Sequence, residues 1–227
     1  MQSCDVRLLG LVPYQQAWDL QADLASQIAA GRLPPTLLLL EHPHTYTFGR
    51  RGQASNLLWS EVELKQRSVQ VFWVDRGGDV TYHGPSQLVG YPLIPLKNSQ
   101  LITSSQSDSA IQPQADYIGY LRRLEGMLIQ ALLQFGVQAS RVKNLTGVWV
   151  DGAKIAAIGV KVDAHGITRH GFALNVTPDM SYWDGIVGCG LAGYSVTSLA
   201  QILTAPPAME EVIQAVIAAF KDVFKFV

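Results

Sequence analysis

One short apolar segment constrains the fold of this chain more than any other. Residues 36–40 read Thr-Leu-Leu-Leu-Leu, with two prolines before them and Glu-His-Pro-His after them. A short continuous apolar run with breakers beside it is typical of a strand that is buried on both faces. We therefore expect residues 36–40 to form a strand near the centre of a sheet.

The rest of the chain predicts both strands and helices. Strand-like patterns occupy residues 6–12, 69–74, 87–96 and 166–176, and a hairpin signal joins 147–150 to 153–162 through Asp151-Gly152. Apolar residues at helical spacing predict helices over 13–31, 116–135 and 208–222. Pro92 and Pro95 cannot donate to a ladder, so residues 87–96 are expected at a sheet edge or with a bulge. Residues 97–114 are rich in Ser, Gln and Asn and predict a flexible surface loop.

Length and composition exclude several classes of protein. A chain of 227 residues suits one domain, or one domain with a small attached lobe, and we expect 1–227 to form a single domain. With 48% hydrophobic residues the chain is not of the disordered class, and a net charge of −1 gives no field to attract nucleic acid. Neither a leader pattern nor a run of about 20 apolar residues is present, so we expect no export and no membrane partner.

Cysteine chemistry is restricted to two positions, Cys4 and Cys189. They give no disulfide framework, and no Cys/His grouping has zinc spacing, so we expect a reduced cytoplasmic protein without a metal. Glycines flank Cys189 and would let a substrate approach the sulfur, whose thiolate is a nucleophile. A small buried side chain in a turn is the alternative, which the local pattern favours.

A lysine offers a possible partner for that cysteine. Alternation along 153–162 places Lys154 on one face of a strand. That face otherwise carries apolar residues: Ala156, Ile158, Val160 and Val162. A lysine in such surroundings can serve as a general base. The alternative, again favoured by the local pattern, is a lysine at the start of a strand whose ammonium group reaches water.

Residues 76–87 combine glycines, hydrogen-bond donors and titratable groups more densely than any other segment. Their glycines have neither the dinucleotide nor the P-loop spacing. His83 could act as a base for Cys189 or orient the loop, and we favour orientation. Arg50-Arg51 and Arg122-Arg123 could contact an acidic carrier protein, although most such pairs are solvated. His42 and His44 have no third metal ligand near them in sequence, which favours a turn.

Taken together, these segments resemble one known family. Residues 76–91, RGGDVTYHGPSQLVGY, match the signature of the octanoyltransferase family of protein lipoylation. Further blocks occur in the same order as in that family: Glu41-His42-Pro43 with 47–50, 152–156, 170–175, and Cys189-Gly190 with Ala192-Gly193. These enzymes move octanoate from acyl carrier protein to a lysine of a lipoyl domain.

The resemblance implies a fold and a site. The fold is α/β, a mixed central sheet flanked by helices with a smaller accessory sheet, similar to biotin and lipoate protein ligases. Cys189 is implied as the nucleophile that carries octanoate as a thioester, and Lys154 as the group that activates the thiol and shuttles protons. Three segments are implied to bind substrate: Arg76, Gly77, Gly78, Asp79, Val80, Thr81, Tyr82 and His83; Ala157, Ile158 and Gly159; Gly171, Phe172 and Ala173.

The resemblance also implies the partners. Octanoyl-acyl carrier protein is the donor, and the acceptors are lipoyl domains of 2-oxoacid dehydrogenase complexes and the glycine cleavage H protein. No cofactor is implied, because a thioester is already activated and its transfer needs no ATP. Two features depart from the family: residues 97–114 replace a shorter basic connection, and Ala157 stands where serine is common. The alternatives are an ATP-dependent lipoate or biotin ligase, a Cys/His thioesterase that uses His83, and a lipoyl-domain binding module without enzymatic activity.

Overall fold

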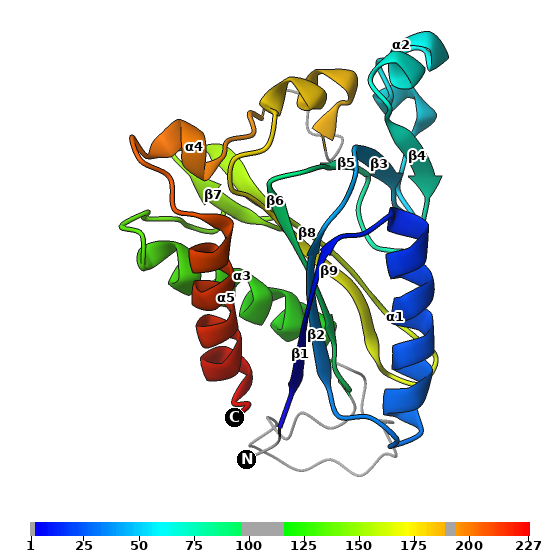
Figure 1. The fold of residues 1–227 in the computed structure, drawn as a ribbon, viewed down its shortest axis with the longest axis vertical. Coiled ribbons are helices and arrows are strands. Elements are labelled where there is room, and N and C mark those ends of the chain that lie inside the picture. Colours follow the sequence, from blue (N-terminus) through cyan, green and yellow to red (C-terminus); the bar gives the residue numbers. More distant parts are fainter. Residues whose placement is uncertain (1–2, 97–115, 189–193) are drawn as a thin grey trace.

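The computed structural model describes residues 3–96, 116–188 and 194–227, and it contains two sheets (Figure 1). The larger sheet has six strands in the order β1-β2-β6-β9-β8-β7. In chain order its strands are β1 (Asp5–Leu11), β2 (Thr36–Glu41), β6 (Gln87–Leu93), β7 (Val148–Val150), β8 (Ala153–Val162) and β9 (Thr168–Asn175). Only β1 and β2 pair in parallel; the other neighbours in this sheet are antiparallel.

Helices cover both faces of the larger sheet (Figure 1). One face carries α1 (Tyr14–Ala29), and the opposite face carries α3 (Tyr117–Leu133) and α5 (Met209–Phe224). The short helix α4 (Leu199–Ile202) precedes α5. Side chains of β2 alternate between these layers: Leu37 and Leu39 pack in the core under α3 and α5, and Leu38 and Leu40 pack in the core under α1. The prediction of a strand buried on both faces is confirmed.

The smaller sheet has the strand order β4-β3-β5 and lies at one end of the larger one (Figure 1). Its strands are β3 (Thr45–Phe48), β4 (Gln70–Trp73) and β5 (Val80–His83). Two short 3₁₀ helices, Ala54–Asn56 and Met180–Gly185, and the helix α2 (Glu61–Gln66) complete the secondary structure of the described residues. The mixed α/β fold with an accessory sheet is therefore as expected. None of the helices in the described ranges is both long and apolar enough to cross a membrane.

The position of β6 contradicts the sequence-based expectation. It lies in the interior of the sheet, between β2 and β9, and all seven of its residues are buried. Proline is tolerated there because pairing with β9 runs only from Gln87 to Gly90, so Pro92 lies beyond the ladder with β9, although it still pairs with Leu37 of β2. At that point the Thr168 hydroxyl donates to the Pro92 carbonyl (2.6 Å) and accepts from the Ile94 amide (3.0 Å). A side chain thus replaces the missing ladder bonds.

Candidate active site

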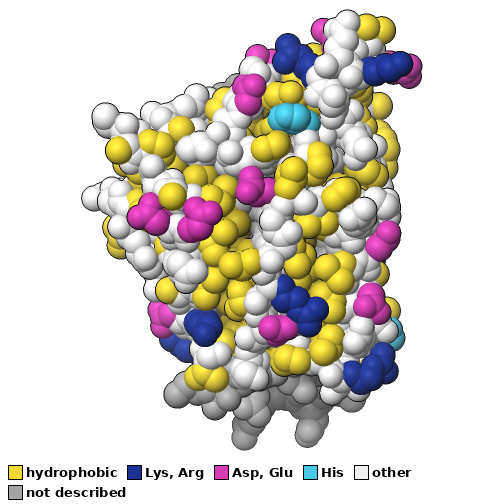
Figure 2. All heavy atoms as spheres, in the orientation of Figure 1, with side chains coloured by type: hydrophobic (Ala, Val, Ile, Leu, Met, Phe, Trp, Pro, Cys, Tyr) yellow, Lys and Arg dark blue, Asp and Glu magenta, His cyan; other side chains and the backbone are white. Residues whose placement is uncertain are grey.

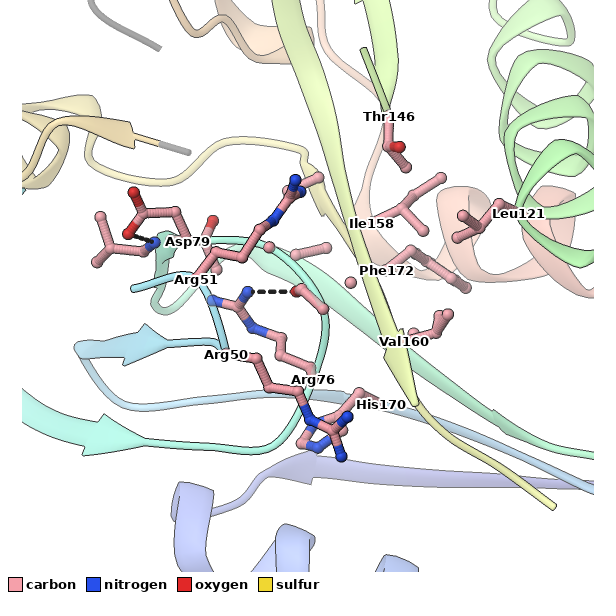
Figure 3. Close-up of a pocket in the computed structure, with 18 of the residues that line it drawn as sticks. Arg50, Arg51, Arg76, Asp79, Leu121, Thr146, Ile158, Val160, His170 and Phe172 are labelled. Atoms are coloured by element: carbon pink, nitrogen blue, oxygen red, sulfur yellow. Dashed lines mark hydrogen bonds between the residues drawn. The ribbon is translucent and has the colours of Figure 1, made fainter. Parts of the chain in front are cut away.

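A cavity of about 700 Å³ lies where the two sheets meet (Figure 3). It forms beside the part of β8 that follows Ala156, where β7 no longer pairs with that edge of the strand. The loop after β4 covers this edge: the Gly77 amide donates to the Val160 carbonyl (3.0 Å). Fourteen of the residues implied by the family resemblance line this cavity: Arg76, Gly77, Gly78, Asp79, Val80, Thr81, His83, Lys154, Ala157, Ile158, Gly159, Gly171, Phe172 and Ala173.

Tyr82 differs from its neighbours in β5 and does not line the cavity. Thr81 and His83 lie beside it in the strand, so alternation directs Tyr82 to the opposite face. There its hydroxyl meets His44 Nδ1 (2.9 Å), and its ring belongs to the small core of the accessory sheet. This structural role differs from the substrate contact that was predicted for Tyr82. Cys189 and residues 97–114 lie outside the described residues.

The position of Lys154 differs from what simple alternation along β8 predicts. The pairing of β7 with β8 shifts between Val148 and Trp149, which leaves Ile155 as an extra residue in β8. Consequently Ile155 and Ala156 both belong to the core under α3 and α5, whereas Lys154 lies against Trp149. Its Nζ is 4.8 Å from the centroid of that indole ring. The bulge therefore separates Lys154 from Ala156, with which it was expected to share a face, although Lys154 still lines the same cavity as Ile158 and Val160.

Lys154 connects the main cavity with the segment on either side of Cys189. Only 5% of its surface is exposed, and it lines both the main cavity and a small neighbouring one. The small cavity is also lined by Gly188 and Tyr194, the last described residue before Cys189 and the first after it. A parallel β-bridge between Lys154 and Val196 holds the backbone of the lysine beside the described residues that follow Cys189. Lys154 thus lies between the main cavity and the two described residues that flank the segment containing Cys189.

A chain of hydrogen bonds joins the signature segment to the accessory sheet. Arg76 Nη2 donates to the carbonyl (2.5 Å) and the hydroxyl (3.0 Å) of Thr47. The Thr47 hydroxyl also contacts His83 Nε2 (3.4 Å), and His83 Nδ1 donates to Gln87 Oε1 (3.0 Å). Burial keeps the pKa of His83 well below its ordinary value, so the ring is neutral at pH 7. Both ring nitrogens are engaged, which supports the orienting role expected for His83.

The same chain continues to Lys154. Gln87 Nε2 donates to Asn175 Oδ1 (2.9 Å), and Asn175 Nδ2 donates to the Thr197 carbonyl (2.9 Å). The Thr197 amide in turn donates to the Lys154 carbonyl (2.9 Å). Buried polar networks of this kind hold their members in one arrangement when every partner is present. Separate sequence blocks therefore cooperate to fix the backbone of the lysine.

His42 is buried beneath the cavity and holds the ends of two strands together. Its Nδ1 donates to the Val12 carbonyl (2.7 Å), and its Nε2 accepts from the Tyr91 hydroxyl (2.7 Å). Burial lowers the pKa of His42 to about 4. His44, two residues away, instead stacks on Tyr182 with a centroid distance of 3.8 Å. The two histidines point to different neighbours, and no cluster of metal ligands occurs among the described residues.

The buried imidazole of His42 should make the stability of the protein depend on pH. The unfolded chain binds a proton below about pH 6.5, whereas folded His42 resists protonation until about pH 4. His42 should therefore contribute roughly 1–3 kcal/mol to the fall in the free energy of unfolding as the pH is lowered from 7 to 4.5. Urea denaturation at both pH values should show a smaller loss of the free energy of unfolding for His42→Gln than for the wild type. The exposed His165 supplies the control, and His165→Gln should behave as the wild type does; an equal loss in all three proteins would exclude His42 as the cause.

Several residues line the cavity that were not predicted to do so. Tyr14 of α1 and Tyr91 of β6 lie at its buried end, and His170 is held by Asp75, with Nε2 2.8 Å from Oδ1. Arg50 and Arg51 extend from the loop after β3 (Figure 3). Arg50, Tyr91 and His170 lie in the sequence blocks that resemble the family, but no spacing rule indicates which side chains of a block face a cavity.

Comparison with known proteins gives the family. Residues 13–221 match the model of the lipoyl protein ligase A/B catalytic domain. The chain is 45% identical over 218 residues to an octanoyltransferase of Rubrobacter xylanophilus, covering 96% of this chain and 91% of the relative. It is also 45% identical over 226 residues to an octanoyltransferase of Chloroflexus aurantiacus, covering 99% and 95%.

Solved structures share the fold at low sequence identity. A lipoate-protein ligase A bound with ATP superposes with a TM-score of 0.73 at 16% identity, covering 100% of this chain and 87% of that one. A biotin protein ligase from Aquifex aeolicus gives 0.52 at 12% identity, covering 99% and 69%. The predicted likeness to both kinds of ligase is confirmed at the level of the fold. The chain therefore belongs to the lipoyl protein ligase A/B catalytic domain family and, within it, to the octanoyltransferases, which are acyltransferases.

Proposed function

We propose that this enzyme transfers an octanoyl group from octanoyl-acyl carrier protein to a lysine of a lipoyl domain. Residues 1–227 form the catalytic domain, Cys189 carries the acyl group as a thioester, and Lys154 moves the protons. Acceptors are the lipoyl domains of 2-oxoacid dehydrogenase complexes and the glycine cleavage H protein. No cofactor takes part.

One observation carries this proposal: Lys154 borders both the main cavity and the small cavity beside the two residues that flank the cysteine segment. Apolar side chains of the main cavity supply a surface for an acyl chain: Leu121, Ile158, Val160, Phe172 and Ala173. A nucleophile, a proton carrier and an apolar pocket are the parts that acyl transfer requires. The relatives named octanoyltransferase support the same acyl group.

The proposed reaction has two halves. In the first, the amine of Lys154 accepts the Cys189 thiol proton, the sulfur attacks the donor thioester carbonyl, and the carrier thiolate leaves and takes the proton from Lys154. In the second, Lys154 accepts a proton from the acceptor amine, which attacks the acyl-enzyme carbonyl. An amide forms, the Cys189 sulfur leaves, and Lys154 returns the proton to it.

The proposal predicts a covalent intermediate on one cysteine. Intact-protein mass spectrometry after incubation with octanoyl-acyl carrier protein, without ATP, should show the added mass of one octanoyl group. Cys189→Ala should remove this adduct entirely because no sulfur remains to form the thioester. Cys4→Ala is the control and should leave the adduct unchanged. An adduct that persists in Cys189→Ala would identify another nucleophile, and activity only with free octanoate and ATP would instead support a ligase.

A further inference from the structure

The lining of the main cavity carries an excess of positive charge. Four of its side chains are lysine or arginine, namely Arg50, Arg51, Arg76 and Lys154, and Asp79 is the one carboxylate among the described lining residues. The chain as a whole has a net charge of −1. An octanoyl thioester is uncharged, so the acyl group does not account for this concentration of cations. A second part of a substrate, one that is anionic, would account for it.

Asp79 forms no ion pair with Arg50 or Arg51 at the cavity mouth. Its Oδ1 accepts from the Val80 amide (2.7 Å), and its Oδ2 accepts from Asn56 Nδ2 (2.5 Å). Within the described part of the chain, no carboxylate lies within ion-pairing distance of Arg50 or Arg51. We refer to these two residues as the arginine rim. Both are exposed, so an incoming anion can reach them.

The backbone that carries the arginine rim is fixed. The amides of Gly49, Arg50 and Arg51 donate to carbonyls of the signature loop, those of Asp79 (3.1 Å), Arg76 (3.0 Å) and Gly78 (3.1 Å). Glycine is required at 49 because a Cβ there would lie 2.5 Å from the Gly78 carbonyl oxygen. The rim and the signature loop therefore form one unit, and binding an anion costs little backbone ordering.

The charges of the rim act on the interior of the cavity. Burial is the main cause of a raised pKa for Tyr117, and the positive charges of Arg51 and Arg50 oppose it. The Tyr117 hydroxyl lies 3.3 Å from the Val160 carbonyl, beside the covered edge of β8. On the face shown in Figure 2, by contrast, basic and acidic side chains are interspersed. The positive charge of the rim therefore acts on a residue that lines the cavity as well as on the exposed mouth.

We propose that Arg50 and Arg51 bind the phosphodiester of the phosphopantetheine arm on which the donor presents its thioester. This inference rests on the proposed function, because it assumes a donor of the acyl-carrier type. A phosphodiester on a flexible arm can follow the thioester to the cavity mouth, and arginine forms paired hydrogen bonds with phosphate oxygens. Carboxylates of a folded acceptor domain are instead held on that domain's surface. The rim thus selects the donor, and the apolar lining selects its acyl group.

Two small donors test this proposal. Octanoyl-phosphopantetheine carries the phosphate, and octanoyl-pantetheine lacks it. Acyl-enzyme formation, followed by mass spectrometry, should give the wild type a kcat/KM at least about tenfold higher for the phosphorylated donor, and this preference should shrink as salt is added. The double variant Arg50→Gln/Arg51→Gln should have a kcat/KM about tenfold lower than the wild type for octanoyl-phosphopantetheine and an unchanged value for octanoyl-pantetheine. It should therefore lose the preference for the phosphorylated donor.

A matched double variant controls for net charge. Arg32 and Lys65 are exposed and do not line the cavity, so Arg32→Gln/Lys65→Gln removes the same charge and should keep the wild-type preference. Equal use of both donors by the wild type would overturn the rim proposal and leave the proposed function standing. Acylation by neither these donors nor octanoyl-acyl carrier protein would instead contradict the proposed function. If the rim variant slowed only transfer from preformed acyl-enzyme to a lipoyl domain, the rim would serve the acceptor, and the proposal would be wrong.

Discussion

Lys154→Met should lower the rate of acyl-enzyme formation by about a thousandfold, the range expected when a positioned proton carrier is removed. Methionine keeps an unbranched apolar stem that can fill the space beside Trp149 but has no amine. The backbone of residue 154 is held by main-chain bonds to Ser195 (2.9 Å) and Thr197 (2.9 Å), which the substitution leaves intact. The loss should therefore appear in kcat, with little change in stability.

Single-turnover acylation of Lys154→Met, measured by quenched mass spectrometry, would check this prediction. Lys143→Met is the matched control, because Lys143 is exposed and precedes Asn144, which lines the cavity. The control should acylate at the wild-type rate. If Lys154→Met retained more than about a tenth of that rate while folded, another group would have to move the proton. His83 and His170 also line the cavity, but both ring nitrogens of His83 already have partners and His170 is held by Asp75.

The secondary structure follows well from local patterns, because each pattern reports which faces are buried. The run at 36–40 alternates between two cores, and the helical spacing at 116–135 buries Leu124 and Leu128 of α3. The hairpin at Asp151-Gly152 is present, with Asp151 at φ 48° and Gly152 at φ 81°. These features depend only on neighbours in sequence, which is why a pattern can predict them.

Features that depend on distant partners were not predictable in this way. The interior position of β6 needs the Thr168 hydroxyl, 76 residues from Pro92. The bulge at Ile155 depends on how β7 pairs, and it changes the surroundings of Lys154. The network from Thr47 to Lys154 joins the blocks at 47–50, 76–91, 170–175 and 152–156 through Thr197, which lies in none of them. The order of these blocks indicated the family but not the contacts between them. The family resemblance supplied the residues expected to bind substrate, and only the tertiary structure shows that Tyr82 does not line the cavity.

Gly171 shows how a lining residue can also be required by the fold. It pairs with Gly159 across β9 and β8, and it lies beside β6 on the other side. A Cβ at Gly171 would lie 2.1 Å from the Gly90 carbonyl oxygen and 2.8 Å from Pro92 Cδ. Neither contact can be relieved by a rotamer change, because one partner is backbone and the other a proline ring. β6 and β9 would have to separate in the middle of the sheet.

Gly171→Ala should therefore lower the free energy of unfolding by about 3 kcal/mol or more, measured by urea denaturation. Gly31→Ala is the control: Gly31 has φ +70°, and a Cβ added there would meet nothing within 4 Å, so that variant should lose only about 1 kcal/mol, from backbone strain. Similar losses in both variants would mean that β6 and β9 adjust easily. A large difference would instead show that close contact between these strands, rather than room for substrate, requires glycine at position 171.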